Sequence, residues 1–204
     1  DDMTVNLTEL FRNPDFWQEV IEIINSFYSI KPIKIWHAGC SSGEEVYTMA
    51  TILHELKVIG RAKLTGTDLS TKMLAMAEEG NYRTQSKKYQ DSLDKVLPGI
   101  DLTKYYDAED GNFHVKSSLK RNISFFQQNL VMDEPPASNF DLIFCRNVMI
   151  YFDDNLKLKV IEKFYNALEE GGFFVIGYYD MMPVGYEKFF TLFNARCRIY
   201  KKNS

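Results

Sequence analysis

The chain has 204 residues, of which 45% are hydrophobic and 14% aromatic, and its formal net charge is −4. These values are typical of one α/β domain with a modest extra element, so residues 1–204 are expected to form a single domain. The acidic balance disfavours a nucleic-acid enzyme, whose domain would usually carry a basic face, and no apolar run approaches the roughly 18 residues that a membrane-spanning helix requires.

The positions of the cysteines and histidines bear on the cellular compartment and on metal binding. Cys40, Cys145 and Cys197 are odd in number and widely spread, which indicates a reducing compartment such as the cytoplasm. His37 and Cys40 lack a second pair of ligands at zinc-site spacing, so no metal site is expected. No signal-peptide pattern occurs at the start of the chain. Because the chain begins with Asp1 instead of methionine, further sequence upstream is expected.

The first predicted helix follows Asn13 and Pro14. Asn is favoured as an N-cap and Pro at the first helical position. Apolar side chains then recur at helical spacing up to about Tyr28. Pro32 separates this helix from the first predicted strand.

Residues 33–56 predict a strand, a turn of small residues over 38–43, and an amphipathic helix. Ser42 and Glu45 have the spacing of a capping box, which marks the helix start. In parallel α/β proteins, such a turn brings backbone N–H groups of the helix N-terminus to a nucleotide-like ligand. The turn is not GxGxxG, which disfavours a nicotinamide dehydrogenase.

Residues 64–67 form the second predicted strand, and Asp68 stands at its end. Folds of this kind hold ribose hydroxyls on an acidic residue about 20 residues past the turn. Gly43 and Asp68 are therefore the first candidate site residues. Ser70 is expected to cap the next helix, over residues 71–79.

Residues 81–127 differ from the rest of the chain, because they are polar and their periodicity is mixed. We predict an inserted β-subdomain here, with a short helix near residues 91–97. Residues 113–115 and 123–127 are expected to form a small antiparallel pair within it. A connection of this length without a core-like pattern is often functional.

Residues 140–144 (FDLIF) form a continuous apolar run, as in a buried parallel strand. Asp153 or Asp154 is expected to cap the helix that follows, and Gly171 with Gly172 to end it.

Two further strands are expected, over residues 173–177 and 197–200. The alternation of strands and helices predicts an α/β fold with a mostly parallel sheet and helices on both faces.

Five motifs, in this order, resemble the C-terminal catalytic domain of the CheR family of chemotaxis receptor methyltransferases. They are NLTELFR (6–12), AGCSSGEEVYT (38–48), GTDLS (66–70), QNL (128–130) and FDLIFCRNVMIYF (140–152). The resemblance covers about residues 4–174. The SSGEE and FCRNVMIYF segments are specific to the family, whereas GTD alone is a weak signal.

The resemblance implies a Rossmann-like S-adenosylmethionine-dependent methyltransferase fold with a small inserted β-subdomain. It also implies a cytoplasmic enzyme that transfers a methyl group to glutamate side chains on the cytoplasmic signalling region of chemoreceptors. The products would be glutamate methyl esters and S-adenosylhomocysteine. Nucleic acid, metal and direct membrane insertion are not expected.

The same resemblance assigns site residues. Arg12 and Tyr151 would lie near the methyl group. The expected cofactor-binding positions are Asn6, Thr8, Arg12, Ala38, Gly39, Glu45, Asp68, Asn129, Leu130, Arg146 and Asn147.

Several of these side chains have an alternative structural role. Glu45 would serve only as the capping-box partner of Ser42, Arg12 as a surface ion-pair residue and Tyr151 as core packing. Arg146 follows a buried strand, where an unpaired charge is costly, so a structural salt bridge is the alternative there.

Esterification of a carboxylate requires few catalytic groups from the chain. The carboxylate is already ionised at neutral pH, since its pKa is near 4.3, so no general base is required. The site must instead align the reacting atoms, which is worth up to roughly 7–11 kcal/mol in favourable systems. Arg12 would hold the substrate carboxylate, and Tyr151 would donate one hydrogen bond and exclude water.

Three features depart from the family pattern. The family's N-terminal helical domain is absent from this sequence, and the insertion lacks the glycine-rich stretch of members that bind a receptor tail. Tyr178 and Tyr179 follow Gly177, where the family tends to have a Ser-Glu pair. Two alternatives therefore stay open: a methyltransferase acting on another protein or a small molecule, and a non-catalytic module that binds the cofactor.

Overall fold

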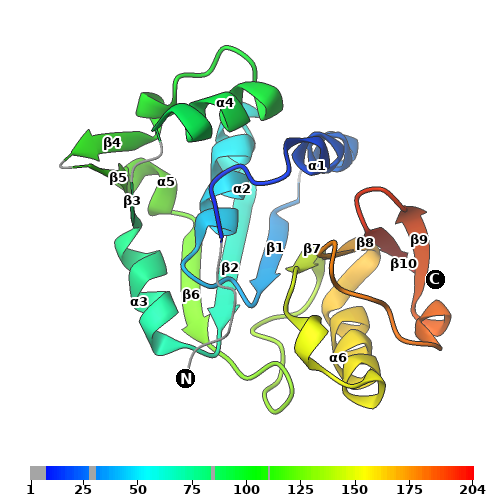
Figure 1. Cartoon of the computed structure of the whole chain (residues 1–204). Helices are drawn as coiled ribbons and strands as arrows, with labels where there is room; N and C mark the ends of the chain where they lie inside the picture. Colours follow the sequence, from blue (N-terminus) through cyan, green and yellow to red (C-terminus); the bar gives the residue numbers. More distant parts are fainter. Residues whose placement is uncertain (1–7, 28–30, 84–85, 110) are drawn as a thin grey trace.

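A seven-stranded sheet forms the centre of the molecule, in the order β6-β2-β1-β7-β8-β10-β9 (Figure 1). The computed structural model of the chain describes residues 8–27, 31–83, 86–109 and 111–204. Neighbouring strands from β6 to β8 run parallel, and β10 is antiparallel to both β8 and β9. The strands are β1 (Ile33–Ala38), β2 (Ala62–Asp68), β6 (Ile123–Gln127), β7 (Phe140–Cys145), β8 (Leu168–Ile176), β9 (Phe190–Asn194) and β10 (Ile199–Lys202).

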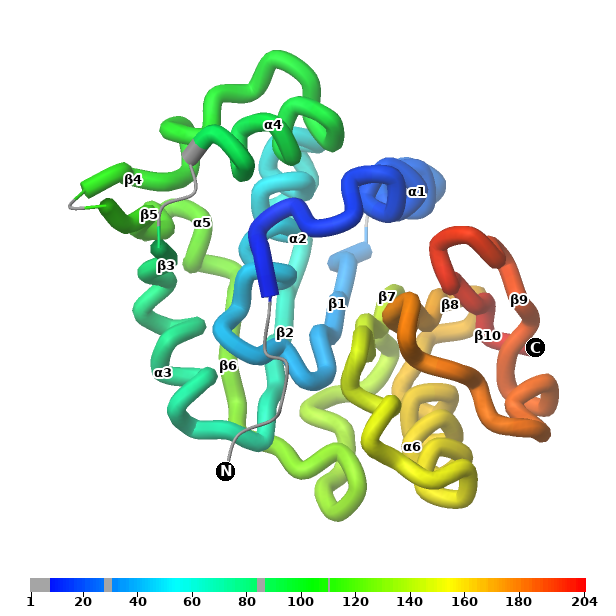
Figure 2. Tube along the Cα trace, viewed as in Figure 1, coloured from blue at the N-terminus to red at the C-terminus, as the bar shows by residue number. Residues whose placement is uncertain are grey.

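Helices cover both faces of the sheet (Figures 1 and 2). In β1, Ile35 packs in the cluster that includes α1, α2 and α4, whereas Trp36 packs in the cluster that includes α6. Successive side chains of a strand point to opposite faces, so both faces of the central strand are buried. The helices are α1 (Pro14–Ser26), α2 (Glu44–Glu55), α3 (Thr71–Glu79), α4 (Ser86–Val96), α5 (Ser117–Lys120) and α6 (Asp154–Ala167). The short 3-10 helices are η1 (Ile59–Arg61), η2 (Leu102–Lys104), η3 (Met149–Tyr151) and η4 (Tyr186–Lys188).

The predicted α/β class is therefore confirmed, and the strand order locates the binding edge. From β1 the chain proceeds to β2 and β6 on one side, and then crosses to β7 and β8 on the other. The point where the strand order reverses, between β1 and β7, leaves a crevice at the carboxyl ends of these strands.

The start of α2 differs from the predicted capping box. Gly43 is the N-cap, with a φ of 90°, and no side chain caps the helix. The Ser42 hydroxyl donates to Glu44, at 2.8 Å, and Glu45 turns toward β1 instead. The capping-box prediction was wrong because Glu45 takes part in a long-range charge network that local spacing does not reveal.

The start of α1 was predicted at the right residue, but not its capping bond. Pro14 is the first helical residue, and Asn13 makes no side-chain cap because its backbone is left-handed, with a φ of 60°. The amide oxygen of Asn13 accepts a hydrogen bond from Arg146 instead, at 2.8 Å.

The inserted region is smaller than predicted. A separate three-stranded sheet, β3-β5-β4, is formed by β3 (Asn81–Arg83), β5 (Asn112–Val115) and β4 (Tyr106–Glu109). Residues 123–127 do not pair with β5, because they form β6 and pair in parallel with β2. The side chain of Asn122 donates to the carbonyls of Ile59 and Ala62 and holds the chain at that edge.

Two boundaries near the C-terminus also differ. Gly171 and Gly172 do not end α6, which stops at Ala167; they lie within β8, where its register against β7 shifts. Bulges of this kind are a common place for strand glycines. Strand β9 was not predicted, because three of its five residues are exposed at the edge of the sheet. Among the described residues, no helix is long and apolar enough to cross a membrane.

Candidate active site

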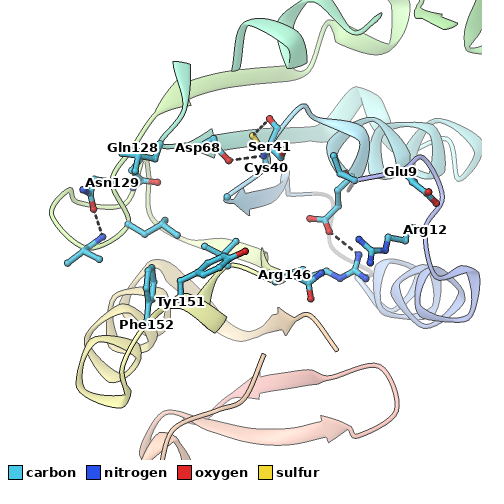
Figure 3. Close-up of a pocket in the computed structure, with 18 of the residues that line it drawn as sticks. Glu9, Arg12, Cys40, Ser41, Asp68, Gln128, Asn129, Arg146, Tyr151 and Phe152 are labelled. Atoms are coloured by element: carbon cyan, nitrogen blue, oxygen red, sulfur yellow. Dashed lines mark hydrogen bonds and ion pairs between the residues drawn. The ribbon is translucent and has the colours of Figure 1, made fainter. Parts of the chain in front are cut away.

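A pocket of about 450 Å³ opens at the carboxyl ends of the parallel strands. Its walls come from the segment before α1, the turns after β1, β2 and β6, and the loop that joins β7 to α6 (Figure 3). Each of these segments follows a different strand or precedes α1, so the pocket forms only when the sheet order brings them together. This position agrees with the crevice expected at the switch point.

The segment before α1 is anchored so that Arg12 faces the pocket. Leu10 and Phe11 are buried, and the Phe11 N–H donates to the Thr48 hydroxyl on α2, at 2.9 Å. The indole N–H of Trp17 donates to the Arg12 carbonyl, also at 2.9 Å. These contacts fix the backbone on both sides of Arg12, which lies beside Arg146 in Figure 3.

Asp68 joins the turns that follow β1 and β2. Its Oδ2 accepts the Ser41 N–H at 2.8 Å, and its Oδ1 accepts the Ser70 N–H at 2.9 Å. An ionised carboxylate has about four acceptor positions, so Asp68 can accept further hydroxyl donors from a ligand. Ser70 also caps α3 as predicted, since its hydroxyl accepts the Met73 N–H.

A charge network closes the other end of the pocket. Nδ1 of His37 donates to one oxygen of Glu45, at 2.8 Å, and Arg146 donates to the other oxygen, at 3.0 Å. The ring of His37 stacks on Phe144, with 4.6 Å between centroids, and the Arg146 guanidinium lies 4.4 Å from the Phe16 ring centroid. Arg146 thus makes a structural salt bridge and lines the pocket at the same time.

Two adjacent carboxyl groups on α2 have opposite pKa shifts. Burial disfavours the charged form of Glu45, but the hydrogen bond from His37 and the charge of Arg146 outweigh it and lower the pKa. Glu44 has no such partners, and burial raises its pKa despite the hydrogen bond from Ser42. Of these two carboxyl groups, Glu45 is therefore the one that stays ionised beside a ligand.

The loop after β6 is held by one of its own side chains and by one from α6. Oδ1 of Asn129 accepts the N–H groups of Val131 and Met132, at 3.0 and 3.2 Å. The ammonium group of Lys163, on α6, donates to the carbonyls of Leu130 and Val131. Asn129 therefore orders the turn through its side-chain oxygen, at the edge of the pocket.

Most of the predicted positions meet in this pocket, although their roles stay predictions. Ala38 and Gly43 do not line it: Ala38 packs in the core cluster of α6, and a Cβ on Gly43 would lie 2.9 Å from Ala77. Asn6 lies outside the described residues. The lining includes Thr8, Arg12, Gly39, Glu45, Asp68, Asn129, Leu130, Arg146, Asn147 and Tyr151.

Other lining residues were not predicted. They include Glu9, Trp17, Cys40, Ser41, Leu69, Gln128, Val131, Val148 and Phe152. All of them except Trp17 and Val131 lie within the family motifs, so the motif boundaries could have suggested them. Trp17 carries no such signal, because its position in the amphipathic α1 is typical of a core residue.

Four buried polar atoms of the lining have no hydrogen-bond partner among the described residues. They are Oγ of Ser41, Oε1 of Gln128, Nε of Arg146 and Oδ1 of Asn147. Buried polar atoms nearly always have a hydrogen-bond partner, so a polar ligand in this pocket would supply the missing partners. No group of three or more histidine, cysteine or acidic residues that could hold a metal occurs in the part of the chain described by the structure.

The match to a family model assigns the chain to the class of S-adenosylmethionine-dependent methyltransferases, and its fold agrees. The TehB-like enzyme of this class from Corynebacterium glutamicum has the same fold, with a TM-score of 0.50 and 14% identity over 89% of this chain and 84% of that one. The family described as CheR methyltransferase, SAM binding domain, matches residues 6–199. The chain belongs to this family, and S-adenosylmethionine is its cofactor.

Two relatives illustrate the similarity. The chemotaxis protein methyltransferase of Borreliella burgdorferi is 35% identical over an alignment of 213 positions, which covers 92% of this chain and 72% of the relative. Chemotaxis protein methyltransferase 1 of Vibrio cholerae is 34% identical over 190 residues, covering 87% and 65%. The chain thus spans about two thirds of the length of such relatives, and only 64% of Cher3 of Pseudomonas putida.

Proposed function

We propose that this chain transfers a methyl group from S-adenosylmethionine to glutamate side-chain carboxylates of chemoreceptors. The products are glutamate methyl esters and S-adenosylhomocysteine. The observation that carries the proposal is that Arg12 and Tyr151 line the same pocket as the acidic residues Asp68 and Glu45. The names of the relatives, chemotaxis protein methyltransferases, support the choice of receptors as substrate. The partner is then the cytoplasmic signalling region of a chemoreceptor, and the place of action is the cytoplasm.

The polar groups of the pocket fit the two chemically different ends of the cofactor. Asp68 and the loop of Asn129 lie at one end, where a carboxylate and an amide suit the hydroxyls and the base of a nucleoside. Glu45, Arg12 and Arg146 lie at the other, where both signs of charge suit an amino-acid group. The orphaned atoms of Ser41, Gln128 and Asn147 provide further partners for a polar ligand. We therefore assign the ribose to Asp68, and the amino-acid group to Glu45, Arg12 and Arg146.

When bound, S-adenosylmethionine supplies a methyl group on a positively charged sulfur, which a carboxylate oxygen can accept without any proton transfer. The chain's own task is to orient the acceptor. Arg12 would bind the substrate carboxylate through charge-assisted hydrogen bonds, and Tyr151 would donate one hydrogen bond and cover the site. Tyr151 is 59% exposed in the structure, so it is available at the entrance to a protein substrate.

The proposal is tested with labelled S-adenosylmethionine and chemoreceptor signalling fragments from the same organism. Glutamate methyl esters are hydrolysed by base, so the label is expected as volatile methanol after alkaline treatment. Methanol release by the wild type that is lost in Arg12→Ala and Asp68→Ala, but kept in Arg121→Ala, supports the proposal. Arg121 is exposed and does not line the pocket.

A different result separates the alternatives. Binding of S-adenosylhomocysteine by calorimetry, together with no methanol from any receptor fragment, would contradict the receptor as substrate. Label transfer to another acceptor would then indicate a methyltransferase of another specificity, and the absence of any turnover would indicate a cofactor-binding module.

A further inference from the structure

Asp180 is fully buried, lies outside the pocket lining and belongs to none of the family motifs. It stands in the turn that follows β8, which begins at Gly177. The neighbouring Tyr178 and Tyr179 are 41% and 75% exposed, so the turn buries its one carboxylate and exposes both aromatic rings. A buried carboxylate requires partners, and Asp180 finds one within its own turn, at Gly177, and one on a different segment of the chain, at Asn147.

The carboxylate connects the turn after β8 to the loop after β7. Its Oδ2 accepts the N–H of Asn147, at 2.5 Å, and the N–H of Gly177, at 2.9 Å. The backbone N–H of Ile150 also stabilises the charged form. Figure 2 shows the two segments side by side, the turn in orange and the loop in yellow. Asp180 therefore binds this loop through the N–H of Asn147, and the N–H of Ile150, next to Tyr151, also favours its charged form.

The geometry of this contact leaves little freedom. Asn147 has a φ of 60°, in the left-handed region that residues other than glycine seldom adopt. A Cβ on Gly177 would lie 2.2 Å from Oδ1 and 2.6 Å from the backbone nitrogen of Asn147. The turn and the loop are thus packed directly against each other, and a shift of one displaces the other.

We propose that Asp180 is a positioning residue of the methyltransferase site: its carboxylate holds the loop that presents Arg146, Asn147 and Tyr151 to the pocket. The inference rests on the proposed function in so far as the pocket binds the cofactor. Asp180 itself does not touch the pocket; it acts through the backbone of Asn147 and Ile150.

The ionisation of Asp180 matters for this role. Burial raises its pKa, while the N–H groups of Gly177, Asn147 and Ile150 and the charge of Lys157 act in the opposite direction. The buried thiol of Cys145 also interacts with the Asp180 carboxylate. Only the ionised carboxylate presents acceptors alone to these N–H groups; protonation, or replacement by Asn, places a donor against them.

The test is the affinity for S-adenosylhomocysteine, measured by calorimetry on the 204-residue chain at pH 7.5. Asp180→Asn is expected to weaken binding about tenfold or more. The matched control is Asp141→Asn, because Asp141 is also buried and accepts a backbone N–H, from Lys34 at 2.9 Å, but lies at the opposite end of β7. The control is expected to stay within about twofold of the wild type. Equal losses in the two variants would overturn the inference.

A pH series adds a readout that general destabilisation would not produce. The ratio of affinities between wild type and Asp180→Asn is expected to shrink as the pH falls toward the raised pKa of Asp180, because the protonated wild type then resembles the variant. Thermal unfolding is measured at each pH, and both proteins are expected to remain folded. A ratio that is constant with pH would contradict the role of the ionised carboxylate.

A second pair of variants keeps the test decisive if Asp180→Asn does not fold. Gly177→Ala pushes on Asn147 from the other side and is expected to weaken binding as well, whereas Gly60→Ala, whose Cβ would meet nothing within 4 Å, is expected to be neutral. Wild-type affinity in Gly177→Ala would overturn the inference. Wild-type binding without methanol release from receptor fragments would contradict only the proposed substrate and leave the role of Asp180 standing.

Discussion

Arg146 donates to Glu45 across 3.0 Å, although the two residues are 101 positions apart in the chain. One stands after β7 and the other on α2, so this ion pair spans the point where the strand order reverses. Its side chains are 8% and 18% exposed, so water screens the pair only in part. The pair also faces the pocket, and stability and ligand binding therefore depend on the same contact.

Arg146→Ala is expected to lower the free energy of unfolding by about 3 kcal/mol, because it leaves the Glu45 carboxylate in a largely buried site with one partner fewer. Urea denaturation at pH 7 measures the change. Arg196→Ala is the matched control: its ion pair with Asp15 is highly exposed, and such pairs contribute less than about 1 kcal/mol. Similar losses in both variants would contradict the importance of burial.

Asp68→Ala is expected to weaken S-adenosylhomocysteine binding roughly 10- to 100-fold, since a hydrogen bond to a charged group is worth about 1.5–3 kcal/mol. Calorimetry measures the affinity. Asp101→Ala provides the control, because Asp101 also accepts a backbone N–H two residues further along, from Thr103 at 2.8 Å, but belongs to the insertion. Unchanged binding in Asp68→Ala would rule out the ribose role.

Arg12→Lys is expected to reduce the rate of methyl transfer at least about tenfold and to reduce cofactor affinity less. Lysine keeps the positive charge but loses the planar fork that binds a carboxylate through two parallel bonds. Single-turnover methanol release gives the rate, and calorimetry gives the affinity. Arg121→Lys, at an exposed position, should behave as the wild type. A full rate in Arg12→Lys would show that charge alone suffices.

Glu44→Gln is expected to change how stability depends on pH. Because burial raises the pKa of Glu44 in the folded state above its ordinary value of 4.5, the native chain binds this proton more tightly than the unfolded chain. The contribution is therefore fully present below pH 4.5 and is lost as the pH rises through the raised pKa. Urea denaturation between pH 4 and pH 8 should show a shallower decline in Glu44→Gln.

The control for this series is Glu162→Gln, because Glu162 is exposed on α6. Its pH profile should match that of the wild type. A wild-type profile in Glu44→Gln as well would indicate that Glu44 titrates normally in the folded chain. Glu45 has the opposite sign: its lowered pKa gives a contribution that is present above pH 4.5 and is lost on further acidification.

Local signals in the sequence were sufficient for much of the sheet and its helices. Ser70 caps α3 and Asp153 caps α6, both as expected, because a cap depends on residues three positions apart. The apolar run of β7 predicted a buried strand, since every one of its residues is buried. Asp68 was found as a candidate from the end of its strand, and the structure places it in the pocket.

The predictions that failed concern partners far away in the sequence. Residues 123–127 have a strand pattern, but nothing in it indicates that their neighbour is β2 instead of β5. Asn13 and Glu45 both carry the local signature of a helix cap, and both turn away from that role toward Arg146 or His37. A buried charge gains more from a charged partner than a helix start gains from one cap.

The sequence by itself determined the class of fold, the strand–turn–helix unit around residues 33–56, and the candidates Arg12, Asp68 and Tyr151. Only the tertiary structure decided which of them share one pocket, how Glu45 is paired, and that Asp180 holds the loop of Asn147. The physical reason is that periodicity and capping report contacts within a few residues along the chain. The strand order of the sheet decides which distant segments meet, and electrostatics and burial then decide which of their side chains pair with each other.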